Sequence, residues 1–96
     1  MKEKVRAEIL VGGLVQGVGF RYYTQITAEK FMLTGWVKNN EDGTVSIMVS
    51  GDDKVLEYFL EEVGSGNQYA YVSQVKKEEL PYKTYENFEI LLDRYF

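Results

Sequence analysis

The spacing of apolar residues changes several times along this chain, and the order of those changes constrains the fold more than any other feature. Apolar and polar residues alternate over 5–12, which predicts a strand with one face in the core. From Phe20 to Phe31 the apolar residues recur at helical spacing, which predicts a helix. The next segments predict a hairpin of strands 35–38 and 44–50, followed by a helix that begins at Asp52 or Asp53 and ends at Gly64. Two further strands are predicted over 69–75 and 88–93.

The predicted order is therefore βαββαβ, with the last β region split in two. Two βαβ units whose middle strands form a hairpin predict a ferredoxin-like α+β sandwich, in which an antiparallel sheet carries both helices on one face. Right-handed crossovers make the first two strands run in the same direction, so Asn39 is expected beside the loop that follows the first strand. The 96 residues suit one domain spanning 1–96.

The loop between the first strand and the first helix contains four glycines within 12–19, followed by Arg21. Glycines let successive backbone N–H groups point into one concavity, and the start of a helix adds the positive end of its dipole. Arg21 adds a permanent charge and a forked set of donors. The segment predicts a cradle for phosphate or carboxylate, whereas the simpler interpretation is a glycine-rich turn with a solvated arginine.

Composition excludes several kinds of chemistry. The chain has no cysteine and no histidine, which removes thiol catalysis, cysteine metal clusters and the usual general base near neutral pH. Its net charge of −4 is the wrong sign for attraction to nucleic acid or to an anionic membrane. No signal peptide and no apolar run of the roughly 20 residues needed for a membrane span are evident, so the cytoplasm is the expected location.

The loop matches neither a Walker A motif nor a complete dinucleotide fingerprint. Residues 13–21 instead read Gly-x-Val-Gln-Gly-Val-Gly-Phe-Arg, and residues 35–39 read Gly-Trp-Val-x-Asn. This two-part pattern resembles the acylphosphatase family, and the likeness continues over almost the whole chain. The resemblance implies hydrolysis of the carboxyl–phosphate bond of acyl phosphates to a carboxylate and inorganic phosphate.

The resemblance also implies roles for particular residues. Arg21 matches the arginine that holds the phosphoryl oxygens, and Asn39 matches the residue that orients the attacking water. Backbone N–H groups of the loop would complete the phosphate site, without a metal or other cofactor. The expected partners are a small-molecule acyl phosphate and inorganic phosphate, as product and inhibitor, and the expected state is a monomer. The loop residues assigned to substrate binding are Gln16, Gly17, Val18, Gly19 and Phe20.

Two other functions compete with this interpretation. An RNA-binding domain can share the βαββαβ order, but the strand over 44–50 has no aromatic residue on which bases could stack. A non-catalytic small-anion sensor would keep the cradle, although it would not need a water-orienting residue such as Asn39.

The chain departs from the family pattern in three places. Asn40 follows the catalytic-type asparagine. The segment 64–68 replaces an expected Gly-Pro and is expected to affect only loop shape. The tail 91–96 either lengthens the last strand or exposes two aromatic residues.

Overall fold

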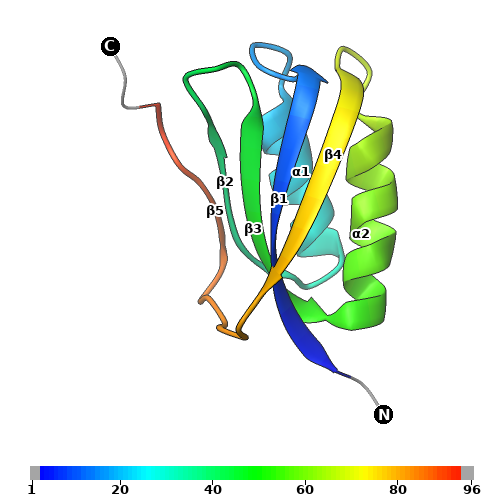
Figure 1. The fold of residues 1–96 in the computed structure, drawn as a ribbon, viewed down its shortest axis with the longest axis vertical. Helices are drawn as coiled ribbons and strands as arrows, with labels where there is room; N and C mark the ends of the chain where they lie inside the picture. Colours follow the sequence, from blue (N-terminus) through cyan, green and yellow to red (C-terminus); the bar gives the residue numbers. More distant parts are fainter. Residues whose placement is uncertain (1–2, 94–96) are drawn as a thin grey trace.

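The computed structural model describes residues 3–93. They form a five-stranded sheet in the order β4-β1-β3-β2-β5, with both helices on one face (Figure 1). The predicted ferredoxin-like α+β fold is confirmed. The elements are β1 (Lys4–Leu14), α1 (Phe20–Lys30), β2 (Thr34–Asn39), β3 (Val45–Asp52), α2 (Asp53–Ser65), β4 (Tyr71–Leu80) and β5 (Phe88–Ile90).

The sequence predicted an antiparallel sheet, whereas the observed sheet is mixed. Strands β4, β1, β3 and β2 pair antiparallel, whereas β5 pairs parallel with β2. After β4 the chain crosses the end of the sheet to the opposite edge, where it runs alongside β2 in the same direction (Figure 1). Hydrogen bonds from Gly35 N to Asn87 O (2.9 Å) and from Leu91 N to Val37 O (2.9 Å) flank this short parallel pair.

The core lies between the sheet and the two helices. Along β1 every second residue is buried, as the alternating pattern predicted. The helices contribute one face each, because residues three and four apart in a helix lie on the same side. The largest fully buried side chains from these layers include Ile9, Val11, Phe20, Ile47, Leu56 and Phe59.

All five strands differ from the predicted ranges at one end or both, and α2 ends later than predicted. Helix α2 begins as expected, with the Asp52 side chain accepting hydrogen bonds from Lys54 N and Val55 N, but it continues through Gly64 to Ser65. Strand β4 extends to Leu80 because it pairs with β1 along its length. Strand β5 ends at Ile90, so the segment that follows does not lengthen it.

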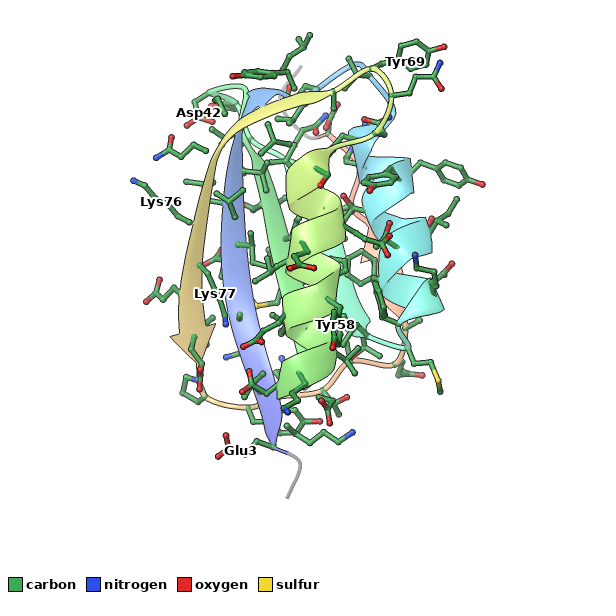
Figure 2. All side chains as sticks on the ribbon, turned by 90° about the vertical axis from the view of Figure 1, so that its right-hand side faces the viewer. Glu3, Asp42, Tyr58, Tyr69, Lys76 and Lys77 are labelled. Atoms are coloured by element: carbon green, nitrogen blue, oxygen red, sulfur yellow. The ribbon has the colours of Figure 1, made fainter. Side chains whose placement is uncertain are left out.

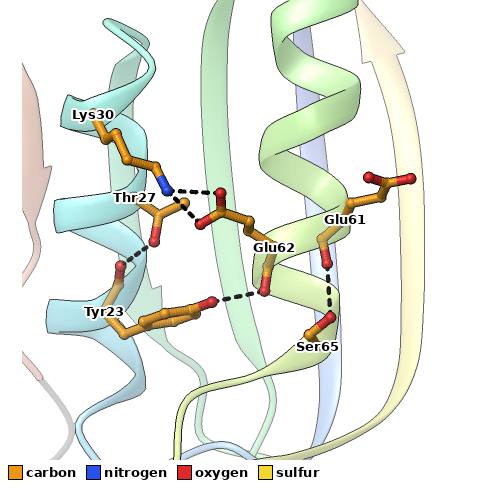
Figure 3. A network of polar contacts seen from close by, with 6 residues as sticks. All are labelled: Tyr23, Thr27, Lys30, Glu61, Glu62 and Ser65. Carbon is orange, nitrogen blue, oxygen red and sulfur yellow. Dashed lines mark hydrogen bonds and ion pairs between the residues drawn. The ribbon is translucent and has the colours of Figure 1, made fainter.

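Polar contacts join the two helices on their outer side (Figure 3). The Tyr23 hydroxyl of α1 donates to the Glu62 carbonyl of α2 at 2.7 Å, and Lys30 Nζ pairs with the Glu62 carboxylate at 2.6 Å. Burial, and secondarily the negative charge of Glu62, raises the pKa of Tyr23. The hydroxyl therefore stays protonated and keeps α1 attached to α2.

Gly35 lets β2 approach β3 closely. A Cβ atom at this position would lie 1.8 Å from the Met48 carbonyl oxygen, and φ is +143°. We expect Gly35→Ala to lower the free energy of unfolding by about 2–4 kcal/mol, from backbone strain and overpacking. Gly64→Ala is the matched control, because Gly64 has open space in a helix and should gain about 0.5–1 kcal/mol. Urea denaturation of both variants measures the difference, and equal stabilities would contradict the geometry.

Three connections meet at one end of the molecule: the β1–α1 loop, the β2–β3 hairpin and the α2–β4 loop (Figure 1). The predicted proximity of Asn39 to the glycine loop follows from this arrangement and is confirmed, since both line one cavity. Within residues 3–93, neither helix has the length and apolar character that a membrane crossing requires.

Candidate active site

A cavity of about 200 Å³ opens where the β1–α1 loop meets the end of β2. Its lining combines loop glycines, the first turn of α1, the end of β2 and Ile90 of β5. We call it the phosphate cavity, after the anion that the sequence predicts at the glycine loop. Five of the predicted site residues line it, namely Gly17, Gly19, Phe20, Arg21 and Asn39. Val18 lies outside its lining, and its carbonyl oxygen is bound by Asn67.

The glycine loop turns sharply into α1. Gly17 and Gly19 have φ of +74° and +78°, a region that side chains rarely adopt, and Gly19 is the N-cap of α1. No side chain of the described residues caps this helix end. The N–H groups of its first turn, together with the positive end of the helix dipole, are therefore available to an anion. The buried Phe20 side chain anchors the turn in the core.

Arg21 lies in the first turn of α1 and reaches the segment after β5. Its Nη1 donates to Leu91 O at 3.2 Å and to Asp93 Oδ1 at 3.2 Å. The side chains of Arg21 and Asp93 are 28% and 42% exposed, so water screens the ion pair and it adds little stability. Within residues 3–93 the hydrogen bonds of Arg21 all involve Nη1. The other two nitrogens are therefore available to a bound oxyanion.

Asn39 is the last residue of β2 and pairs with Val45 of β3. Its Oδ1 atom is buried, and no group within residues 3–93 donates a hydrogen bond to it. A buried acceptor without a donor costs about 1–3 kcal/mol, so such an atom calls for a partner from outside the protein. Because Asn39 lines the phosphate cavity, a water molecule or substrate group there could supply that donor.

The Gln16 side chain turns away from the cavity and binds the hairpin. Its Nε2 donates to Asn40 O at 2.7 Å and to Thr44 O at 2.9 Å. The side chain of Asn40, which follows Asn39 in the chain, donates through Nδ2 to Thr44 Oγ1 at 2.9 Å and to Ser46 Oγ at 2.8 Å. Gln16 therefore fixes the glycine loop to the hairpin that carries Asn39, a connection that sequence reasoning missed.

The segment 64–68 does more than shape a loop, contrary to the prediction. Asn67 Nδ2 donates to the Val18 carbonyl at 2.8 Å, which attaches the α2–β4 connection to the glycine loop. The two residues are far apart in the sequence, and no local pattern indicates that they meet. Asn67 is thus a positioning residue of the cradle that the sequence did not reveal.

The hairpin carboxylate of Asp42 has a structural partner. Asp42 Oδ1 accepts hydrogen bonds from Thr44 Oγ1 at 2.6 Å and from Thr44 N at 3.0 Å. Both hydrogen bonds lower the pKa of Asp42, and the bond from the Thr44 hydroxyl has a larger effect than the bond from the Thr44 backbone N–H. In the described part of the chain, no three Asp or Glu side chains gather closely enough to hold a metal ion.

The tail was predicted to lengthen the last strand or to expose Tyr95 and Phe96. Strand β5 ends at Ile90, and Leu92 is exposed. Residues 94–96, which include both aromatic residues, lie outside the described part of the chain. The described part of the tail, residues 91–93, instead contributes the carbonyl and the carboxylate that hold Arg21.

A small cavity with an arginine and a helix N-terminus, on a ferredoxin-like fold, has the chemistry of an oxyanion site. Comparison with known proteins assigns it more closely. The acylphosphatase family model matches residues 7–90. An acylphosphatase of Bacillus licheniformis is 49% identical over 71 residues, which are 74% of this chain and 79% of that protein.

Further matches are similar in extent. An acylphosphatase of Thermotoga petrophila is 45% identical over 83 residues, covering 86% of this chain and 92% of that protein. The crystal structure of an acylphosphatase from Bacillus subtilis superimposes with a TM-score of 0.89 at 38% identity, covering 92% of this chain and 99% of that one. The chain therefore belongs to the acylphosphatase family, as its glycine loop and Asn39 segment predicted.

Proposed function

We propose that this protein is a metal-independent acylphosphatase that cleaves the carboxyl–phosphate bond of small acyl phosphates. Membership in the family supports the reaction, and the phosphate cavity supports the mechanism. In this proposal Arg21 and the backbone N–H groups of residues 16–20 hold the phosphoryl oxygens. Asn39 orients the water that attacks phosphorus. The observation that carries the proposal is that Arg21, Asn39 and the start of α1 line one cavity, while within residues 3–93 no side chain caps that helix and no group donates to Asn39 Oδ1.

The reaction places modest demands on the protein. Water oxygen bonds to phosphorus, the bond from phosphorus to the carboxyl oxygen breaks, and the carboxylate leaves with that electron pair. Because a carboxylate is a good leaving group, the reaction depends mainly on positioning and on stabilising charge at the phosphoryl oxygens. Backbone dipoles and Arg21 can supply this stabilisation without a metal.

The direct test measures loss of acetyl phosphate and benzoyl phosphate by purified protein, with and without a chelator. We expect hydrolysis of both that is unchanged by the chelator, and competitive inhibition by inorganic phosphate, which would occupy the same cavity. Activity that disappears in chelator and returns with magnesium would contradict the mechanism. A folded protein that binds phosphate and hydrolyses neither compound would be an anion sensor.

The proton of the attacking water needs an acceptor. The chain has no histidine, and Asp42 is a poor candidate because its hydrogen bonds to Thr44 lower its pKa. We therefore assign the proton to the phosphoryl group of the substrate, whose second ionisation has a pKa near or below the roughly 6 of phosphate monoesters.

This assignment predicts how activity changes with pH. The acidic limb of the kcat/KM profile should move with the phosphate pKa of the acyl phosphate used. It should not move in Glu41→Gln or Asp42→Asn. If either amide removes the limb and lowers the rate by the roughly 10²–10⁴ expected for loss of a general base, then that carboxylate accepts the proton.

We also expect the protein to act as a single domain, as a monomer, and in the cytoplasm. Sedimentation of the purified protein over a range of concentrations tests the monomer, and cell fractionation tests the location.

A further inference from the structure

Two grooves continue from the phosphate cavity, and they differ sharply in chemistry. A groove of about 650 Å³ shares Gly19 and Tyr22 with the cavity and extends between α1 and the α2–β4 connection. A larger groove of about 1380 Å³ shares Asn39 and Ile90 and extends along β5. When a phosphoryl group occupies the cavity, these two grooves are the adjoining surfaces that an acyl group attached to it can contact.

The smaller groove, called here the tyrosine groove, has no charged side chain in its lining among residues 3–93. Tyr22, Tyr69 and Ile26 line it and are 63%, 67% and 45% exposed. Large apolar side chains that border a cavity and remain open to water favour contact with an apolar group. Figure 2 shows Tyr69 at the end of the molecule where the α2–β4 connection turns.

The walls of the tyrosine groove are held in place before any ligand binds. Tyr23, which also lines it, is fixed by the hydrogen bond from its hydroxyl to Glu62 O. The opposite wall is fixed by Asn67, which donates to Val18 O, and by the turn in which Ala70 N donates to Asn67 O at 3.2 Å. A preformed groove loses little conformational entropy when it is filled.

The larger groove is unsuited to a substrate that is already anionic. Within residues 3–93, its lining contains the carboxylates of Glu29, Glu41 and Glu89, the Asp93 carboxylate that is paired with Arg21, and one cation, Lys38. An acyl group that carries a further carboxylate or phosphate would be repelled there. In the tyrosine groove, such a group would lose water without gaining a cationic partner.

From this contrast we infer that the tyrosine groove receives the acyl group. The preferred substrates are then acyl phosphates with an apolar, above all aromatic, acyl group. The acetyl group of acetyl phosphate has a single methyl to bury against Ile26 and Tyr69, and acyl phosphates with a second anionic group are disfavoured. This inference rests on the proposed function, and Ile26 and Tyr69 become its specificity-determining residues.

The test compares kcat/KM for benzoyl phosphate with kcat/KM for acetyl phosphate, as a ratio, in variants of the full chain. We expect Tyr69→Ala and Ile26→Ala each to lower the ratio by roughly 2–10-fold, the scale of one aromatic contact. The matched control is Tyr58→Ala, since Tyr58 is 61% exposed on α2 and lies far from Tyr69 (Figure 2). The control should keep the wild-type ratio. A ratio is insensitive to the fraction of protein that folds.

The outcomes separate this inference from the proposed function. If the wild-type protein hydrolyses both compounds and neither groove variant changes the ratio, the tyrosine groove is not the acyl site and the proposed function stands. If folded wild-type protein hydrolyses neither compound, the proposed function fails and the inference fails with it.

A second comparison tests the discrimination by charge. Butanoyl phosphate and succinyl phosphate have four-carbon acyl groups and differ by one carboxylate. We expect the wild-type protein to have the higher kcat/KM for butanoyl phosphate, and the preference to shrink as salt screens the repulsion. Equal values at low salt would overturn this part of the inference.

Discussion

Arg21→Ala should abolish both phosphate binding and turnover, with kcat/KM for acetyl phosphate falling by roughly 10³ or more, the lower end of what a transition-state arginine contributes. Arg21 is the only cationic side chain that lines the phosphate cavity, within the residues that the structure describes. Its loss leaves the phosphoryl oxygens with backbone donors alone. The inhibition constant of inorganic phosphate and the kinetics of the variant measure the two effects separately.

Arg21→Lys should recover little of the lost activity. One ammonium group cannot provide two parallel hydrogen bonds to a phosphoryl group, whereas the nitrogens of Arg21 that are not bound to Leu91 and Asp93 can. Arg6→Ala is a control for the loss of one positive charge, because Arg6 binds Pro81 O and Tyr85 and is not part of the phosphate cavity. A full rescue by lysine would show that charge alone is required.

Asn39→Ala should behave differently from the arginine variants. We expect phosphate to bind with nearly unchanged affinity, while kcat falls by roughly 10²–10³, the scale for removing one positioned polar group at a reacting centre. The physical reason is the buried Asn39 Oδ1, which has no donor within residues 3–93 and can accept a hydrogen bond from the attacking water. The measurements are kcat for benzoyl phosphate and the inhibition constant of phosphate.

An exposed amide from the neighbouring groove provides the control for Asn39. Asn87 is exposed and binds Gly35 through its backbone carbonyl, so Asn87→Ala should leave kcat unchanged. If Asn39→Ala weakens phosphate binding as much as Arg21→Ala does, Asn39 is a phosphate-binding residue and another group orients the water.

The sequence predicts the fold well where apolar periodicity is strong, and less well where tertiary pairing decides. The buried alternation of β1 and the helical spacing after Phe20 both identify their elements correctly. The charged run 76–79 hides the second half of β4, which forms because β1 offers partners along its whole length. Gly64 predicts a helix end, but α2 continues one residue further to Ser65.

In the site, too, some contacts can be predicted from the sequence and others cannot. The handedness of the crossover suffices to bring Asn39 beside the glycine loop, and the structure confirms that proximity. The contact of Asn67 with Val18 and the attachment of Arg21 to residues after β5 join segments that are distant in the chain. No spacing rule relates those segments, because loop conformation depends on the packed structure around it.

The two hydrogen bonds of the Gln16 amide mean that the site becomes ordered when the chain folds, before a substrate binds. They join the glycine loop to Asn40 and Thr44 on both sides of the hairpin turn. The loop N–H groups that the proposal assigns to phosphate and the Asn39 amide that it assigns to water therefore belong to one stiff unit, whose entropy is lost when the chain folds. A substrate that arrives later does not have to order them, so more of its binding free energy remains to favour the transition state.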